Sequence, residues 1–305
     1  MKRSIGPALL AACLAGPLPC TAGPYAGAAG TSNTTAIAAD DPRFVAWADD
    51  WTDYQVGPEV DPQWQNPENA LGPAEGDIYS IVSLGRGGSI TLTFRAPITD
   101  GPRWDFAVFE NSFNDTFLEL AYVEVSSDGI HFFRLANASL TPEPVPSYGA
   151  VDSTDIDGLA GKYRAGYGTP FDLSDLRDSS PLLDLSHITH VRLVDVIGDG
   201  TCTDSCGRPI YDPYPTTGSA GFDLDAVGVI NSAERPRISR SSQGIRLQWY
   251  AASARTYRVQ YCDDPRGGDW SNLTPELVGE GAERSVIDTN VSASRIRFYR
   301  IVYHD

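Results

Sequence analysis

Two acid-rich segments, more than a hundred residues apart, carry residue types that bind a metal ion. Asp223 and Asp225 are two positions apart in the run GFDLDAVGVIN, so in a β-strand their carboxylates emerge on one face. Glu110 and Asn111 end the apolar run WDFAVFEN, in which Asp105 adds a further carboxylate. Neighbouring carboxylates repel unless a cation or a shared proton relieves them. Because calcium favours carboxylate and amide oxygens, these five residues predict a structural calcium site. The alternative is that the acids are solvated or paired with arginines.

Aromatic residues in two long loops are the second candidate for chemistry. Flat exposed rings stack on sugar faces or on large planar ligands, and a tyrosine adds a polar tip. The loops contain five tyrosines that could form such a ligand-binding surface: Tyr148, Tyr163, Tyr167, Tyr211 and Tyr214. The alternative is that these rings pack the loops onto the body of the domain.

Catalytic motifs are absent from the sequence. Hydrolysis of a glycosidic bond needs two carboxylates, but in a chain with 40 acidic residues candidate pairs arise by chance. The sequence has no GxSxG elbow, no HExxH motif and no phosphate-binding loop. We therefore predict a non-catalytic protein and keep a glycoside hydrolase as the least favoured alternative.

Net charge and the first residues indicate where the chain works. A formal charge of −17 over 305 residues excludes nucleic acid and anionic membranes as partners. Lys2 and Arg3 precede a short apolar run, and small residues follow it, as in a secretory signal peptide over residues 1–22. The alternative is a lipoprotein with its lipid on Cys13. No later run is long and apolar enough to span a membrane.

Cysteines suggest an oxidising compartment. Cys202 and Cys206, in TCTDSCG, are predicted to form a disulfide. The loop they close is so short that the bridge contributes only about 2 kcal/mol. A zinc half-site is the alternative, but no second half is present. Cys262 is left over and is expected to be buried.

Short strands separated by Gly and Pro predict an all-β protein with two domains. Residues 23–40 have the composition of a flexible linker, and residues 41–232 form the large domain. The turn signal Asp128-Gly129 predicts a two-residue type I′ hairpin turn. The stretch 141–184 reads as one long loop. Expected strands of the large domain are 78–84, 89–94, 104–109, 120–126, 131–135, 190–197 and 222–230.

The last seventy residues change character and predict a small second sandwich over 234–305. IRLQWYAASARTYRVQY, Trp270 after a DDP turn, and the closing RFYRIVY resemble the fibronectin type III-like module of large bacterial surface proteins. That resemblance implies a spacer or adaptor.

The large domain also carries blocks that resemble a known group of proteins. SLGRGGSITLTF, DFAVFEN, LAYVEVSSDG, IDGLAGKYRAGYGTPFDL, ITHVRLVDVIGD and GFDLDAVGVIN are similar to secreted bacterial cell surface proteins of the PEP-CTERM-associated type. The strand order resembles galactose-binding jelly rolls, and more distantly surface proteins of corrinoid uptake. The resemblance implies a jelly-roll-like β-sandwich and a secreted or cell-surface binding protein for carbohydrate with a structural calcium. The alternatives are an adhesive surface protein without a small ligand, and an accessory protein for corrinoid or other nutrient capture.

Overall fold

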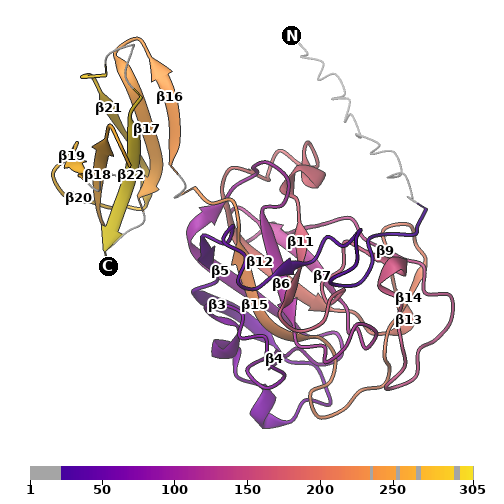
Figure 1. The fold of residues 1–305 in the computed structure, drawn as a ribbon. Helices are drawn as coiled ribbons and strands as arrows, with labels where there is room; N and C mark the ends of the chain where they lie inside the picture. The colour runs from indigo at the N-terminus through magenta and orange to yellow at the C-terminus, as the bar shows by residue number, and fades with distance from the viewer. Residues whose placement is uncertain (1–21, 234–235, 252–254, 266–268, 292–295, 305) are drawn as a thin grey trace, which may run out of the picture.

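Two β-rich units make up the protein. The computed structural model describes residues 22–233, 236–251, 255–265, 269–291 and 296–304, and Figure 1 shows the large unit and the small unit as separate bodies. The predicted signal peptide, residues 1–22, thus lies outside the described residues except for its last residue, and Cys13 lies outside them as well. No helix in these ranges is long and apolar enough to cross a membrane.

The large unit is a β-sandwich of two antiparallel sheets, which confirms the predicted all-β class. The first sheet contains β1 (Ile37–Ala38), β11 (Tyr167–Phe171), β6 (Phe106–Glu110), β15 (Asp223–Val229) and β2 (Ala46–Trp47) in that order, with β4 (Val82–Ser83) also on β15. The second contains β3 (Asp50–Gln55), β5 (Ser89–Ile98), β12 (Ile188–Asp195), β7 (Ala121–Ser126) and β8 (Phe133–Arg134). The remaining elements are the pairs β9 (Ala138–Ser139) with β10 (Ile156–Asp157) and β13 (Asp199–Thr203) with β14 (Pro209–Tyr211), and four 3₁₀ turns at Pro62–Trp64, Pro67–Ala70, Ser153–Asp155 and Leu173–Leu176.

The main hydrophobic core lies between these two sheets. Ile90 and Leu92 of β5 and Leu193 of β12 meet Phe106 of β6 and Leu224 of β15, and all five are fully buried. The alternation predicted for β5 places its apolar residues in this core. Burial of apolar surface stabilises by about 25 cal/mol per Å², so this layer dominates the stability of the unit.

A β-bulge interrupts β15. Leu224 pairs with Glu110 and Ala226 pairs with Phe109, so Asp225 is the extra residue. Before the bulge Leu224 faces the main core, whereas Ala226 faces a second cluster on the outer side of the sheet. The bulge therefore places Asp223 and Asp225 in different surroundings, although they are only two positions apart.

The segment 23–40 is not a linker, which corrects the prediction. Ile37 is 2 % exposed and pairs with Gly168 of β11, and the Tyr25 amide donates to the Thr154 carbonyl at 2.8 Å. The small residues that gave this segment its linker-like composition allow the backbone to pack closely on the domain. Ala29, for instance, is 7 % exposed.

The stretch 141–184 is likewise not one structureless loop. It contains β10 and β11, and β11 pairs with β6 in the middle of the first sheet. Two 3₁₀ turns in it are capped by aspartates: Asp152 accepts from the Thr154 amide, and Asp172 accepts from the Ser174 amide. Side-chain caps of this kind satisfy amides that the turns leave free.

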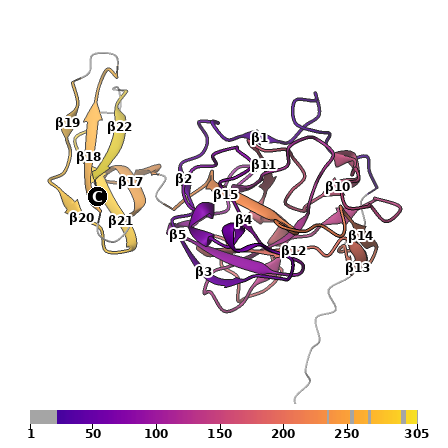
Figure 2. The same cartoon turned by 90° about the horizontal axis from the view of Figure 1, so that it is seen from below.

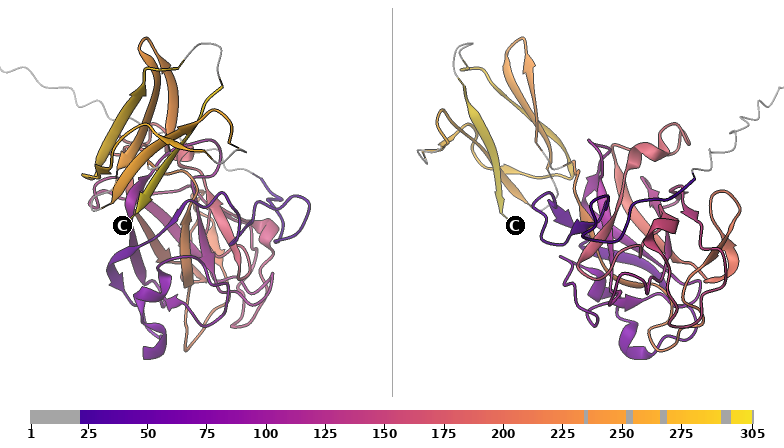
Figure 3. Two further views of the ribbon diagram at one scale, coloured as in Figure 1. Left: turned by 60° about the vertical axis from the view of Figure 1, so that its left-hand side comes forward. Right: turned by 45° about the vertical axis from the view of Figure 1, so that its right-hand side comes forward.

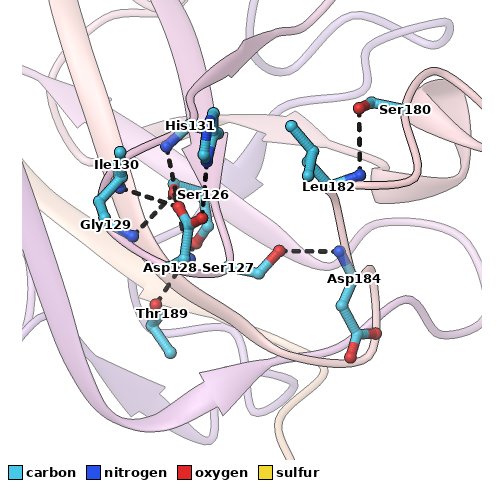
Figure 4. Close-up of polar contacts among 10 residues, drawn as sticks. All are labelled: Ser126, Ser127, Asp128, Gly129, Ile130, His131, Ser180, Leu182, Asp184 and Thr189. Carbon is cyan, nitrogen blue, oxygen red and sulfur yellow. Dashed lines mark hydrogen bonds and ion pairs between the residues drawn. The ribbon is translucent and has the colours of Figure 1, made fainter.

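The hairpin predicted at Asp128-Gly129 exists, but its turn is longer than the two residues predicted. β7 and β8 pair through Val125 and Phe133, which leaves several residues between the strands. Gly129 has φ 72°, but Asp128 is not in the left-handed region that a type I′ turn requires. Instead, Figure 4 shows that the Asp128 carboxylate accepts from the amides of Ile130 and His131, both at 2.8 Å. Local bonds from this aspartate select the wider turn.

The small unit consists of two facing antiparallel sheets. One contains β16 (Arg237–Ser241), β17 (Gly244–Ala251) and β21 (Ala282–Asp288); the other contains β18 (Thr256–Cys262), β19 (Ser271–Asn272), β20 (Leu277–Val278) and β22 (Phe298–His304). Figures 2 and 3 show these strands, in orange to yellow, as a body of their own. Trp249 and Tyr257, each 2 % exposed, form its core. Cys262 is buried, as predicted.

Candidate ligand pocket at the ends of strands β6 and β15

The corner where β6 ends beside β15 gathers buried acids. The Asn111 amide donates to Asp223 Oδ2 at 3.3 Å, and the Ser83 hydroxyl donates to Asp223 Oδ1. Asp223 is 2 % exposed, and burial raises its pKa to about 7. The sequence predicted that Asn111 and Asp223 meet, and the structure brings them together.

Two glutamates surround this aspartate. Glu110 is 1 % exposed; its Oε2 accepts from the Ser112 amide at 2.8 Å, while its Oε1 has no hydrogen bond to any described group. Burial, and next the charge of Asp223, raise the pKa of Glu110 well above its ordinary value. Glu119 is 4 % exposed, and burial followed by the charges of Asp223 and Glu110 raises its pKa in the same way.

No arginine, lysine or histidine within the described ranges forms an ion pair with these three acids. Their common charge is therefore relieved by protonation or by a bound ligand rather than by a basic side chain. Sites with carboxyl groups perturbed in this way are candidates for function.

A pocket of about 180 Å³ opens over Glu119 and Asp223. Apart from Ile78, its other side chains are polar or aromatic. We call it the Asp223 pocket, and its lining is Ile78, Asn111, Phe113, Phe117, Glu119, Tyr148, Thr216, Thr217, Ser219 and Asp223. Glu119 is held in place by the Thr216 hydroxyl, which donates to it at 2.8 Å.

Stacked aromatic rings form one wall of the Asp223 pocket. The ring centroids of Phe113 and Phe117 lie 4.9 Å apart, and those of Phe117 and Tyr148 lie 5.8 Å apart, with both pairs stacked. Phe113 is 60 % exposed and Tyr148 is 80 % exposed. Clustered exposed aromatic rings are unusual on the surface of a protein, and they mark a place where a bound ligand could cover them.

Asp105 does not belong to this corner, which corrects the predicted ligand set. It precedes β6 at the opposite end of the strand and ties three segments together. Its carboxylate accepts from the amides of Gly101 and Leu173 and from the Asn231 side chain. Burial, only partly offset by these bonds, raises its pKa to about 6.

Asp225 is bound by backbone amides rather than by the other predicted calcium ligands. Its two oxygens accept from the amides of Glu75 and Gly76 at 3.1 and 3.0 Å. The five residues predicted as calcium ligands therefore do not converge. In the described part of the chain, the only three acidic, histidine or cysteine ligand atoms within 4.8 Å of one another belong to Asp100, Asp105 and Asp172.

That alternative trio is already occupied by hydrogen bonds. Besides the bonds to Asp105, Arg177 donates to Asp100 at 2.9 Å and the Ser174 amide donates to Asp172 at 2.9 Å. Because these carboxylates already accept hydrogen bonds, the trio fits a contact that holds loops together better than a calcium site, which needs oxygens free to bind the ion.

The five predicted ligand-binding tyrosines do not share a face. Tyr148 lines the Asp223 pocket, as described above. Tyr163 is 1 % exposed with its hydroxyl bonded to Thr35 at 2.8 Å, so its prediction as a ligand contact is wrong. Tyr211 packs in an inner apolar cluster. Tyr167 and Tyr214 are half-buried under the guanidinium groups of Arg164 and Arg86.

The predicted disulfide between Cys202 and Cys206 is absent, because Cys202 is a free thiol. Cys202 lies in β13 and packs against an apolar cluster, whereas Cys206 lies in a turn fixed by Asp204, which accepts the Cys206 amide at 2.9 Å. Cys206 is disulfide-bonded, but not to Cys202.

Glu119, Thr216 and the Phe113–Phe117 pair were missed by the sequence analysis. One signal in the sequence could have revealed Glu119. It lies between Leu118 and Leu120 in an apolar run, and a glutamate in such a run is seldom buried without a special role. The pairing of the 113–119 segment with Tyr148 and Thr216 follows only from the fold. A scan against protein-family models and a search of curated proteins both find no match for this chain.

Proposed function

We propose that the large domain is a non-catalytic module that binds a carbohydrate in the Asp223 pocket. The observation that carries this proposal is the exposed aromatic stack beside the buried carboxyl groups of Glu119 and Asp223, which form no ion pair with a described basic side chain. Sugars need both features, because their rings offer apolar C–H faces and their edges offer hydroxyls.

The aromatic wall suits the apolar face of a sugar ring. Tyr148 is the most exposed of the three stacked rings, and its partner Phe117 is 9 % exposed, so the stack is anchored at one end. Ring faces held in this way lose little conformational freedom when a ligand covers them. Tyr148 is therefore the residue expected to contribute most to affinity.

The polar floor suits the hydroxyl edge. Glu119 and Asp223 offer acceptor oxygens, while Asn111, Thr216 and Ser219 can both donate and accept. At about 180 Å³ the pocket is smaller than those that enclose drug-sized ligands, so it fits one sugar unit rather than a long chain segment.

We propose an extracellular location, either secreted or at the cell surface. The signal-peptide pattern of residues 1–22 supports it, because such a segment directs a chain out of the cytoplasm. The small unit has the two-sheet form expected of a fibronectin type III-like module, and we propose that it serves as a spacer.

Glycoside hydrolysis is the second candidate, because Glu119 has a raised pKa and lines the pocket together with Asp223. A protonated glutamate facing a second carboxyl group is the arrangement that glycosidases use. The bonds from Ser83 and Asn111 to Asp223 favour binding over catalysis, because both Asp223 oxygens already have partners.

A glycan array followed by titration calorimetry tests the proposal. We expect Tyr148→Ala to weaken binding of the best glycan at least tenfold, whereas Tyr303→Ala, at an exposed tyrosine of the small unit, leaves it unchanged. No glycan bound at millimolar concentration, or equal loss in both variants, would sink the proposal. Release of free sugar from the bound glycan, abolished by Glu119→Gln, would identify the hydrolase instead.

A further inference from the structure

Lys162 is a buried amine that the proposed function does not use. Lys2 and Lys162 are the two lysines of the chain, and Lys162 is 2 % exposed. Gly161, with φ 85°, packs against the Glu119 carbonyl so closely that no side chain fits there, and this contact fixes the loop that carries Lys162.

The ammonium of Lys162 has more donors than partners. It donates to the Ile156 carbonyl at 2.6 Å. No other hydrogen bond from it to a described residue exists, although an ammonium group carries three donors. Burial, opposed by the charge of Asp157, lowers the pKa of Lys162 to about 8, so the group is mainly charged at neutral pH.

A cavity of about 120 Å³ adjoins this amine. We call it the Lys162 pocket; Trp104 and Phe171 form apolar walls, and Lys162 and Thr169 contribute polar groups. Thr169 is 4 % exposed, and its hydroxyl has no hydrogen bond to any described group. A buried hydroxyl without a partner costs about 1–3 kcal/mol, so this cavity is built to receive a polar atom.

Three aspartates complete the lining of the Lys162 pocket: Asp157, Asp172 and Asp175. Asp157 and Asp175 are exposed, so they stand toward solvent, while Lys162 and Thr169 are buried. The pocket thus has a donor-rich inner end and an acidic outer end. A ligand that matches both ends carries an anionic group and a cationic group close together.

From this polarity we infer that the Lys162 pocket binds a small free amino acid as its zwitterion. The carboxylate of the ligand accepts from Lys162 Nζ and Thr169 Oγ1, and its ammonium group faces Asp157, Asp172 and Asp175. The small volume restricts the ligand to a short side chain, such as that of glycine, alanine or serine. This site is distinct from the Asp223 pocket and does not depend on the function proposed for it.

Titration calorimetry on the full chain at pH 7 tests this inference, with glycine, alanine and serine as probes and acetate and methylamine as single-ended controls. We expect a zwitterion to bind at least tenfold more tightly than either control. Lys162→Met and Thr169→Val should each weaken binding at least tenfold, whereas Thr52→Val, at an exposed position of β3, should not change it. No heat with any amino acid at ten millimolar, acetate binding as tightly as glycine, or unchanged binding in Lys162→Met would overturn the inference.

A labelling experiment does not depend on whether the Lys162→Met variant folds. The wild-type chain is treated with acetic anhydride, and peptide mass spectrometry follows acetylation of Lys162, which is readily assigned because the chain has only two lysines. An amino acid that occupies the pocket should slow acetylation of Lys162 severalfold, and methylamine should not. Equal acetylation rates with and without glycine, alanine and serine would show that water alone fills the cavity.

Discussion

Replacing Asp223 with asparagine should stabilise the protein by about 4 kcal/mol at pH 8 and by less than half of that at pH 5. Burial raises the pKa of Asp223 to about 7, against an ordinary value of 3.8. Because the folded pKa lies above the unfolded one, the protonated carboxyl group contributes stability that is fully present below about pH 4. That contribution is lost as the pH rises through about 7.

The size of the effect follows from the shift. One pKa unit corresponds to about 1.4 kcal/mol, so a shift of about three units makes ionisation of Asp223 cost on the order of 4 kcal/mol at pH 8. Asparagine keeps the shape of the side chain and cannot ionise. The variant also lacks the negative charge that raises the pKa values of Glu110 and Glu119 in the wild type, and this loss stabilises the variant further.

Urea unfolding followed by tryptophan fluorescence at pH 5 and pH 8 measures this effect, since four of the six tryptophans lie in the large domain. Asp204→Asn is the matched control. Burial alone would raise the pKa of Asp204, but bonds from the amides of Arg208 and Ser139 and from the Arg208 guanidinium lower it overall. That variant should lose about 2 kcal/mol at pH 8. An Asp223→Asn variant that is less stable than wild type at pH 8 would refute the reasoning. It would mean that a cation neutralises the ionised carboxylate, and a chelator should then lower the melting temperature of the wild type alone.

Two further outcomes follow from the fold. Leu193→Ala, in the centre of the main core, should destabilise the large domain by about 3 kcal/mol in the same urea assay, whereas Leu182→Ala, at a 55 % exposed leucine, should change it by less than about 0.5 kcal/mol. Alkylation of the unreduced, denatured protein should modify Cys202, and peptide mass spectrometry that finds Cys202 unmodified would contradict its assignment as a free thiol.

The strands of the large domain were largely predictable because their burial is periodic. In β5, Ile90 and Leu92 face the main core at every second position, and the runs around Phe106 and Val191 are apolar enough to be central. Strand ends were harder to predict, since Pro97 lies inside β5 although proline usually breaks a strand. The pairing of residues 23–40 with β11 was hidden because small residues serve both flexible linkers and close packing.

The candidate site was only half predictable, for a different reason. Spacing on a strand suggests which carboxylates share a face, but the bulge at Asp225 changes what each one meets. The contact between Asn111 and Asp223 was predicted correctly, because Asn111 follows the end of β6 and Asp223 begins β15, and these two strand ends lie side by side. Glu119 and Tyr148 reach the same pocket from separate loops, and no local pattern records that contact.

Hydrogen-bond saturation separates the acids that hold the fold from those that remain available to a ligand. Asp195 is 3 % exposed, and its two oxygens accept from the amides of Gly87 and Phe222, each at 2.8 Å. Asp105 and Asp225 are saturated by amides in the same way, so removing any of these carboxylates would orphan backbone donors. Glu110 is equally buried but keeps one oxygen without a described partner. In a chain with a net charge of −17, acidity alone marks no site. The unpaired oxygen of Glu110 and the exposed stack beside Glu119 are what set this corner apart from the other buried acids.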